Sequence, residues 1–309
     1  MKKFILNTGL FLIFTFLFYI TSLFLWSTLT PSFLKPNLNY RIGSHGHMYT
    51  RISELKNYGN VDILFLGSSH TYRGFDTRIF RKNGYKSFNL GSSSQTPVQT
   101  KLLLKRYLNK LNPKLIIYEV YPENLFSSDG VESAVDLIAN DPNDLLSFEM
   151  ALKINNIKIY NTLTYGLIRQ LLGLNKNFYE PKVKQYDKYI SGGYVERKLG
   201  FYKQPKFTQK QITIRNYQFD AFLETVQIIK NKNIELILVY APIPKSNYER
   251  YTNNEYFDSI MSKFSTYYNF NKILNLDDSL HFFDCDHLNQ NGVEIFNNKV
   301  IEILKDKFY

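Results

Sequence analysis

The sequence has very little cysteine, since Cys285 is the only one among 309 residues. A single thiol excludes an internal disulfide framework and any zinc or iron–sulfur site that needs several cysteines. Glycine patterns of the Walker or dinucleotide type are also missing, so nucleotide chemistry has no support. The chain has no internal repeats, and its 44% of hydrophobic residues is enough for a sizeable core.

Charged side chains are absent between Lys3 and Lys35, and Phe, Leu and Ile dominate residues 4–26. At about 1.5 Å per residue, a helix of that length spans roughly 34 Å, which is enough to cross a bilayer. A cleavable signal peptide is the alternative, but its apolar core is normally shorter and ends at small residues. Bulky side chains continue up to Ser27 here, and they favour an uncleaved transmembrane anchor within residues 1–35.

Lys2 and Lys3 precede the apolar run, and the positive-inside rule then places the N-terminus in the cytoplasm. We therefore expect a single-pass protein of the cell membrane in which residues 36–309 form one extracytoplasmic domain. The chain carries 38 Lys and Arg against 27 Asp and Glu, a net charge of +11. Nucleic acid is not an expected partner outside the cytoplasm. Anionic lipid head groups, teichoic acids and acidic glycans suit this charge instead.

After a polar connector at about residues 31–57, short apolar runs alternate with amphipathic stretches. Five apolar runs predict strands buried in a parallel sheet, at residues 61–66, 87–90, 115–120, 234–240 and 272–276. Three amphipathic stretches predict helices, at residues 96–111, 212–232 and 292–305. Strands separated by helices indicate an α/β fold whose parallel sheet is covered on both faces.

The segment 121–211 does not follow this alternation. Its first half is acidic, whereas the stretch from Asn175 to Arg215 is basic and rich in tyrosine. We interpret the segment as an insertion over the carboxyl end of the sheet, where open α/β sheets bind ligands. A solvated, irregular excursion without contact to a substrate is the alternative. The tyrosines of the basic half are Tyr179, Tyr186, Tyr189, Tyr194 and Tyr202.

Two short segments contain residue types that can carry out chemistry. Gly67-Ser68-Ser69 directly follows the first strand, and a serine on such a turn lies at a helix N-terminus, where negative charge is favoured. Asp284 precedes His287 by three residues, so its carboxylate can accept from the imidazole Nδ1–H and leave Nε2 to take a proton from serine. Together the segments supply the serine, histidine and carboxylate of an activated hydroxyl nucleophile.

These motifs resemble those of the SGNH (GDSL-like) hydrolase superfamily. The Gly-Asp-Ser turn of that family is matched by Gly67-Ser68-Ser69, its second glycine block by Asn89-Leu90-Gly91, and its final D-x-x-H by Asp284 to His287. The resemblance covers roughly residues 62–301 and implies a three-layer α/β/α, flavodoxin-like domain. The anchor and the Gly-Ser-Ser variant look most similar to the membrane-anchored branch, which includes the DltD proteins and the alginate and peptidoglycan O-acetylation proteins.

Position by position, the resemblance implies that Ser69 is the nucleophile, His287 the general base and Asp284 its orienting carboxylate. The backbone N–H groups of Ser69 and Gly91 would form the oxyanion hole. Asp286 also stands beside His287, but adjacent residues rarely present their side chains to each other, which favours Asp284.

The family's third block, G-x-N-D, which supplies an oxyanion asparagine, is absent. Tyr121-Pro122-Glu123-Asn124 follows the third strand instead, and Asn124 is a candidate replacement. Loss of one oxyanion donor typically lowers the rate about 10²–10³-fold. Slow turnover or a specialised acyl donor would follow.

The remaining histidines and the thiol are weaker candidates. His45 and His47 form a His-x-His pair, but no acidic or cysteine ligand stands near them in the sequence, so we expect neither a metal nor a cofactor. His70 and His281 flank the two motifs and are expected to shape the pocket. Nothing marks Cys285 as an activated thiol, and we expect it to pack.

The sequence therefore predicts an extracytoplasmic serine esterase or O-acyltransferase. An acetyl or similar small acyl group would pass through an ester of Ser69 to or from a hydroxyl of a cell-envelope polysaccharide, with tyrosines of the insertion stacking on sugar rings. The resemblance implies a multi-span membrane O-acyltransferase as a partner. Two alternatives stay open: a carbohydrate esterase without a partner, and a non-catalytic adaptor that recruits an acyltransferase or binds glycan.

Overall fold

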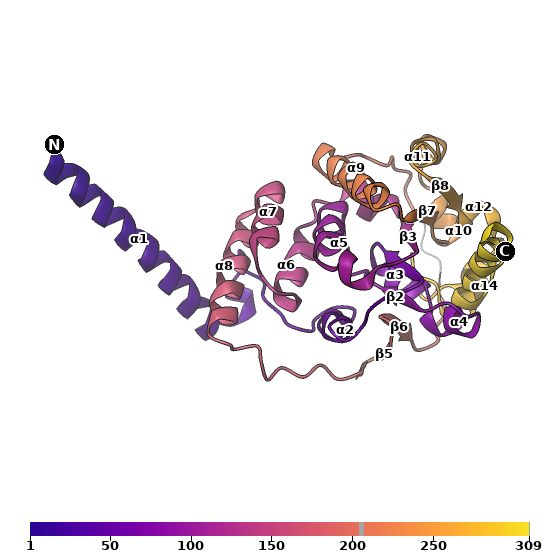
Figure 1. Cartoon of the computed structure of the whole chain (residues 1–309), viewed down its shortest axis with the longest axis horizontal. Coiled ribbons are helices and arrows are strands. Elements are labelled where there is room, and N and C mark those ends of the chain that lie inside the picture. The colour runs from indigo at the N-terminus through magenta and orange to yellow at the C-terminus, as the bar shows by residue number, and fades with distance from the viewer. Residues whose placement is uncertain (204–206, 309) are drawn as a thin grey trace.

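The computed structural model describes residues 1–203 and 207–308. One long N-terminal helix projects away from a body of helices and strands (Figure 1). The main sheet has five parallel strands in the order β2-β1-β3-β7-β8. By rank along the chain this order is 2-1-3-4-5, that of flavodoxin-like doubly wound folds. The predicted α/β class with a parallel sheet is confirmed.

The elements fall into three groups. The strands of the main sheet are β1 (Ile63–Leu66), β2 (Ser87–Asn89), β3 (Leu115–Glu119), β7 (Glu235–Tyr240) and β8 (Thr266–Asn269). A small antiparallel sheet contains β4 (Val183–Lys184), β5 (Asp187–Ile190) and β6 (Tyr194–Arg197). The helices are α1 (Lys2–Leu29), η1 (Ser32–Leu34), α2 (Met48–Leu55), α3 (Ser69–Gly74), α4 (Thr77–Lys82), α5 (Pro97–Leu111), η2 (Glu123–Ser127), α6 (Val131–Asn140), α7 (Leu145–Ile154), α8 (Ile157–Leu171), α9 (Asn216–Asn231), α10 (Lys245–Tyr248), α11 (Asn254–Met261), α12 (Phe270–Ile273), α13 (Asp278–His281) and α14 (Gln290–Phe308).

Alternate residues of the central strands enter two separate cores. On β1, Leu64 and Leu66 join the core that contains apolar residues of α5 and α9, whereas Ile63 and Phe65 join the core that contains those of α14. Side chains of a strand alternate between the faces of a sheet, so both faces of β1 are buried. This burial explains why the strand is apolar throughout.

Helix α5 begins and ends where the sequence predicts. Thr96 is its N-cap and forms a capping box with Gln99, while Pro97 occupies the first helical position. The capping box supplies acceptors for N–H groups that the first turn leaves unpaired, and proline has no N–H group to leave unpaired. Asn112 ends the helix in the left-handed conformation, with φ of 40°.

Two predicted boundaries in the C-terminal half are wrong. The last strand is β8, because residues 266–269 pair with β7 and the Asn269 side chain then caps the start of α12. Residues 272–276 therefore form the end of a helix and a loop instead of a strand. Helix α9 begins at Asn216 instead of residue 212, because the Ile212 N–H is held outside the helix by Asn253 Oδ1 at 2.8 Å.

The predicted polar connector at residues 31–57 is also wrong in part, because it contains helix α2 and contributes to the core. Met48, Ile52 and Leu55 of this helix are buried. The side chain of Arg51 is fully buried as well. Its Nε and Nη2 donate to Gly193 O at 3.1 and 3.0 Å, and Nη2 also donates to Gly46 O at 2.9 Å.

The described part of the segment 121–211, which leaves out residues 204–206, contains four helices and the three strands of the small sheet. Helices α6, α7 and α8 of its first half pack on one another, on α5 and on α2. The second half forms the small sheet, and Gly192 O accepts from the Asn89 N–H at 2.7 Å, at the carboxyl end of β2. The basic half thus lies at the predicted end of the main sheet, while the helical half lies near α1 (Figure 1).

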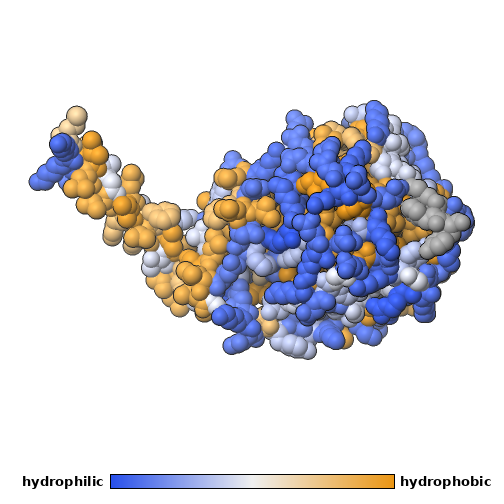
Figure 2. Space-filling model, viewed as in Figure 1, coloured by the Kyte–Doolittle hydropathy of each residue, from blue (hydrophilic) through white to orange (hydrophobic). Residues whose placement is uncertain are grey.

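Helix α1 is exposed along its apolar length, and its apolar surface ends in a hydrophilic N-terminal tip (Figure 2). It is long and apolar enough to cross a membrane, although a signal sequence near the N-terminus can meet the same criteria of length and composition. Its C-terminal part contacts the domain: Tyr19 OH donates to Asn161 Oδ1 at 2.6 Å, and the Phe24 ring lies 5.8 Å from that of Tyr165.

Replacement of Arg51 by methionine tests the contribution of the buried guanidinium. We expect the free energy of unfolding to fall by about 2–3 kcal/mol, because the carbonyls of Gly193 and Gly46 lose their buried donor. Chemical denaturation followed by circular dichroism measures the change. Arg81→Met, at an exposed position of α4, is the control, and equal stability of the two variants would contradict the assigned role.

Candidate active site

The Gly67-Ser68-Ser69 turn joins β1 to α3, and its glycine is sterically required. Gly67 has φ of +136°, and a Cβ there would lie 2.3 Å from Thr71 Oγ1 and 2.9 Å from Glu119 O. Ser68 is the N-cap of α3. Ser69 is the first helical residue, so its backbone N–H has no acceptor within the helix.

The three residues predicted as a triad lie together. His287 Nε2 is 2.8 Å from Ser69 Oγ, although 218 positions separate the two residues. Asp284 lies on the other side of the ring, with Oδ1 and Oδ2 at 2.9 and 3.1 Å from His287 Nδ1. Asp284 Oδ1 also accepts the backbone N–H of His287 at 2.9 Å, which holds the loop in a tight turn. The arrangement gives a hydroxyl, an imidazole and a carboxylate in the order that proton transfer from serine requires.

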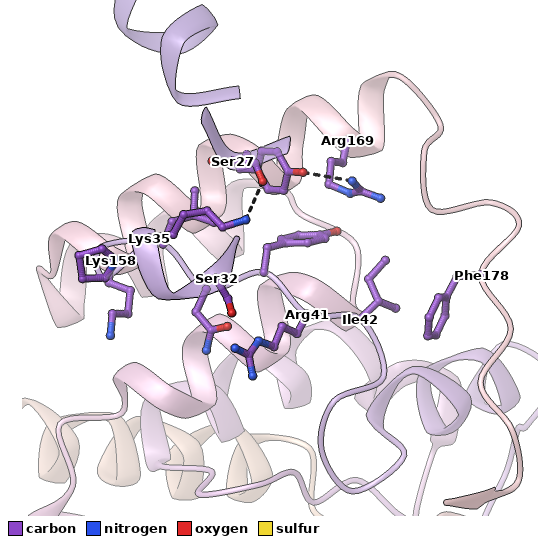
Figure 3. A pocket seen from close by; sticks show the side chains of 13 residues that line it. Ser27, Ser32, Lys35, Arg41, Ile42, Lys158, Arg169 and Phe178 are labelled. Atoms are coloured by element: carbon purple, nitrogen blue, oxygen red, sulfur yellow. Dashed lines mark hydrogen bonds between the residues drawn. The ribbon is translucent and has the colours of Figure 1, made fainter. Parts of the chain in front are cut away.

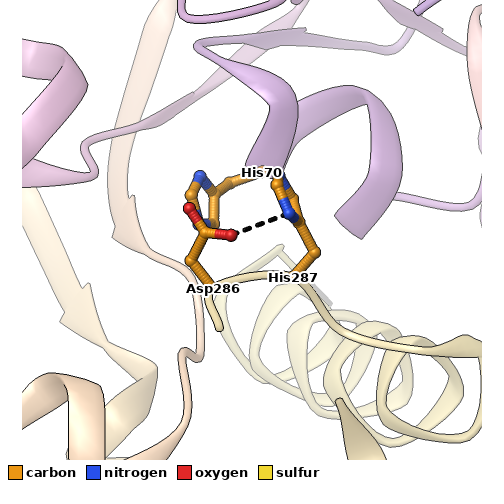
Figure 4. Close-up of side chains that lie close together, drawn as sticks. All are labelled: His70, Asp286 and His287. Carbon is orange, nitrogen blue, oxygen red and sulfur yellow. Dashed lines mark ion pairs between the residues drawn. The ribbon is translucent and has the colours of Figure 1, made fainter. Parts of the chain in front are cut away.

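A second carboxylate reaches the same ring nitrogen, so the expectation that Asp286 stays away from its neighbour is wrong. Asp286 Oδ1 lies 2.8 Å from His287 Nδ1 (Figure 4). Burial alone would lower the pKa of His287, but the charge of Asp286 and the hydrogen bonds to both carboxylates raise this pKa to about 10. Burial also disfavours the charged form of the Asp286 carboxyl, but the His287 imidazolium holds the pKa of this carboxyl well below its usual range. Both carboxylates therefore favour the protonated form of the ring.

Beneath the turn lies a buried network that the sequence analysis missed. Ser68 Oγ is 3.2 Å from His70 Nδ1 and 3.2 Å from Glu119 Oε2. Burial raises the pKa of Glu119 to about 8 and lowers that of His70 to about 4. Both groups are thus mainly neutral near pH 7. The His70 ring stacks on that of His287, with 4.9 Å between the ring centroids.

The predicted oxyanion donor Gly91 lies against the nucleophile turn, and its amide already has an acceptor. A Cβ at this position would lie 2.8 Å from Ser68 O, so glycine is required for the close approach. The Gly91 N–H donates to Asn89 Oδ1 at 3.1 Å. Asn124 lies on η2, and no hydrogen bond within residues 1–203 and 207–308 joins its side chain to the triad.

The insertion contributes an arginine that the sequence analysis did not single out. Arg197 of β6 has Nη1 3.4 Å from Asp284 Oδ2, and its guanidinium lies 4.4 Å from the Phe283 ring centroid. Its Nε donates to Asp187 Oδ1 at 2.9 Å. The basic stretch of the insertion was the only signal in the sequence that pointed to such a contact. The basic half therefore reaches the candidate triad.

Three tyrosines of the basic half, Tyr189, Tyr194 and Tyr202, cannot stack on a ligand as expected, because they are buried. Tyr189 OH donates to Glu54, and Tyr194 OH donates to Gln290 Oε1 at 2.8 Å. Tyr179 and Tyr186 are exposed.

Three smaller expectations also change. Cys285 is exposed instead of packed. His281 Nδ1 accepts the N–H of Asp277 at 2.9 Å, which holds its ring on α13 instead of in the pocket. His47, unlike exposed His45, is buried and does have an acidic neighbour, Glu180, at 3.9 Å.

Two groups of side chains near the triad are close enough to hold a metal ion. One consists of His70, Asp286 and His287, whose ligand atoms lie within 4.8 Å of one another, and the other of Asp284, Cys285 and Asp286. In the first group, however, Asp286 and His287 already form an ion pair at 2.8 Å. The direct carboxylate–imidazole contact suits proton transfer without a metal.

Neither a protein-family model nor a curated protein matches the chain. Among solved structures, the chain is similar to a GDSL-like lipase from Bacteroides thetaiotaomicron, with 11% identity and a TM-score of 0.43, over 85% of this chain and 99% of that chain. A proposed acylhydrolase from Bacteroides fragilis is similar at the same identity and TM-score, over 85% of this chain and 98% of that chain.

Asp286→Asn tests the effect of the second carboxylate on His287. Because a negative charge within hydrogen-bonding distance favours the imidazolium, its removal should lower the pKa of His287 by about one unit or more. NMR titration of the labelled histidines, with His287 assigned through His287→Gln, measures the shift. Asp220→Asn, an exposed position on α9, should leave the midpoint unchanged; the same midpoint in Asp286→Asn would count against the assigned contact.

Glu119→Gln tests the buried carboxyl through the pH dependence of stability. The folded state keeps this proton up to about pH 8, whereas an ordinary glutamate loses it near 4.5. The folded state therefore binds more protons across this window, and its stability falls as the pH rises from about 4.5 to about 8. The amide does not titrate, so the melting temperature of Glu119→Gln should fall less over this range.

The exposed variant Glu294→Gln, on α14, is the matched control for Glu119→Gln. It should follow the wild-type curve. Parallel curves for wild type and Glu119→Gln would show that the carboxyl is already ionised in the folded protein.

Proposed function

We propose that this protein is a serine-dependent esterase or acyl-transfer enzyme. One observation carries the proposal: Ser69 Oγ lies 2.8 Å from His287 Nε2, and the other ring nitrogen faces the Asp284 carboxylate at 2.9 Å. Serine is a weak nucleophile unless a neighbouring base takes its proton. A non-catalytic adaptor would have no need for this aligned hydroxyl and imidazole.

In the first half-reaction, Ser69 Oγ attacks the acyl carbonyl carbon while its proton passes to His287 Nε2. The tetrahedral oxyanion then collapses, the bond from the acyl carbon to the leaving alcohol oxygen breaks, and His287 returns the proton to that oxygen. In the second half, water or a sugar hydroxyl loses its proton to His287 and attacks the acyl carbon of the acyl-Ser69 ester. The bond from this carbon to Ser69 Oγ then breaks, and His287 returns the proton to that oxygen. Asp284 orients the ring and stabilises the imidazolium that forms twice in this cycle.

The raised pKa of His287 determines which form of the enzyme is ready to react. Only the neutral ring can accept the serine proton. In the enzyme without substrate, the two carboxylates raise the pKa of His287 to about 10. The base form is then a small fraction at neutral pH, and turnover should increase with pH. An acyl donor whose binding excludes water from Asp284 and Asp286, or neutralises them, would change the fraction of His287 that is neutral.

Oxyanion stabilisation would come from backbone amides. The Ser69 N–H stands free of helical acceptors at the start of α3. The Gly91 N–H is adjacent to this turn, and it would become available if the Asn89 side chain rotates away from its present 3.1 Å contact. Two such donors aimed at the developing charge are the usual requirement of acyl transfer.

For the substrate, we propose an O-acetyl or similar small acyl ester on a cell-envelope polysaccharide. The exposed apolar helix α1 supports a place at the outer face of a membrane. The basic composition of the second half of the insertion, together with exposed Tyr179 and Tyr186, supports an acidic glycan as acceptor or donor. A multi-span O-acyltransferase would supply the acyl group in the transfer case, and a partner-free carbohydrate esterase is the second candidate.

Ser69→Ala tests the proposal directly. We expect hydrolysis of a chromogenic acetyl ester to fall by about 10³-fold or more, because removal of the nucleophile leaves only binding and oxyanion stabilisation. A fluorophosphonate probe should label Ser69 of the wild-type chain, and mass spectrometry of the labelled peptide identifies the site.

Ser259→Ala is the matched control, since Ser259 is exposed and its hydroxyl donates only to Tyr256 O. It should keep full activity and labelling. Equal ester turnover by wild type and Ser69→Ala, or labelling at another serine, would reject the proposed nucleophile.

A further inference from the structure

A cavity of about 490 Å³ lies where the C-terminal end of α1 meets the domain, apart from the candidate triad (Figure 3). It is bounded by the end of α1, by the segment that follows it and by α8. Four of its lining residues are basic, and no Asp or Glu is among the described residues that line it. They are Lys35, Arg41, Lys158 and Arg169.

These four cations lack acidic partners. Across residues 1–203 and 207–308, no ion pair includes any of the four side chains. Several buried or half-buried bases elsewhere are paired with a carboxylate, as in Arg73 with Asp187 at 2.8 Å. Like charges gathered around one cavity repel one another unless an anion neutralises them. The cavity is therefore lined by four cations without an acidic side chain among its described residues to neutralise them.

Arg169 is held in place before any ligand binds. Its guanidinium carbon lies 5.4 Å from the Tyr40 ring centroid and 5.5 Å from that of Tyr165. Its Nε donates to Asn175 Oδ1 at 3.0 Å and its Nη1 to Tyr165 OH at 3.2 Å. Its Nη2 also donates to Leu174 O at 3.4 Å. Since a guanidinium has five N–H donors, one N–H on each Nη stays available to an anion, and the fork geometry suits phosphate.

Two other groups add donors at the end of α1. Lys35 Nζ donates to Ser27 O at 2.8 Å, which leaves two of its three protons for a ligand. The Ser27 hydroxyl is buried, and its oxygen has no hydrogen-bond partner among the described residues. Such an unpaired buried hydroxyl is costly unless a ligand or water satisfies it.

The position of the cavity along α1 indicates the source of the anion. It begins at Ser27, directly after Trp26 and the apolar length of the helix. Tryptophan and basic side chains at this place are typical of the membrane–water interface, where phosphate groups of lipids lie. We propose that this cavity binds a phosphate group, carried by the head group of an anionic phospholipid. This proposal does not depend on the chemistry of Ser69.

The test uses the full chain and two double variants with equal loss of charge. Arg41→Gln/Lys158→Gln removes two cavity cations for which no structural hydrogen bond is described. Lys232→Gln/Lys263→Gln removes two exposed lysines outside the cavity. Each protein is placed in phosphatidylcholine nanodiscs with a minority of phosphatidylglycerol, and native mass spectrometry counts the lipids retained after release.

We expect wild type and the control variant to retain phosphatidylglycerol. The amount retained by the cavity variant should fall on the order of tenfold, because two interfacial cations are lost. Inorganic phosphate should not displace the lipid. The melting temperature in detergent checks that the cavity variant is folded, and Arg169→Lys, which keeps the charge but removes the fork, should weaken retention without loss of fold.

A second arm separates the two sources of phosphate. If inorganic phosphate raises the melting temperature of wild type and control but not of the cavity variant, and no lipid is preferred, the site binds a soluble phosphate and not a head group. Equal retention and equal phosphate response in the cavity and control variants would overturn the proposal, because general electrostatic attraction would then explain all binding.

Discussion

The contact between the Ser69 hydroxyl and the His287 imidazole depends on how α14 is fixed to the end of α3. Asn297, fully buried on α14, accepts the Asp76 N–H at 2.8 Å and donates to Gly74 O at 2.6 Å. One amide thus satisfies a donor and an acceptor where α3 ends and α4 begins. Phe296 of α14 packs on Phe75 at the same place, with 5.1 Å between the ring centroids. Because these contacts are short and buried, the loop before α14 can hold His287 against the turn after β1.

Charge is distributed unevenly around this contact. Two carboxylates, Asp284 and Asp286, face one imidazole, so the ring is stabilised as a cation. Directly behind it, His70 and Glu119 are buried and mainly neutral near pH 7. A second cation at His70 would repel that of His287, and burial prevents it. The neutral network gives the turn hydrogen bonds through Ser68 without adding charge to the site.

The sequence predicts those features that local physics determines. Strands β1, β3 and β7 are mainly apolar because both of their faces are buried, although β3 ends at Glu119 and β7 begins at Glu235. The serine turn and the Asp-x-x-His loop are short motifs. Strand β8 was missed because Thr266 to Asn269 is a polar edge segment, whose pairing with β7 depends on the rest of the sheet. Burial of Arg51 was missed for a similar reason, since its acceptor Gly193 O is 142 positions away. The approach of Asp286 to His287 depends on the curvature of one loop, which residue spacing does not specify.

The insertion links the two ends of the molecule. Its helix α8 contacts α1 through Asn161 and Tyr165, and its strand β6 places Arg197 beside Asp284. Arg51 of α2 joins the halves, because it donates to Gly193 O while α2 packs on α6. Each of these contacts involves buried or half-buried groups. The described part of the insertion therefore packs against both ends of the molecule instead of joining them as a flexible linker. The contacts at the two ends of the insertion therefore set the direction of α1 relative to the candidate triad.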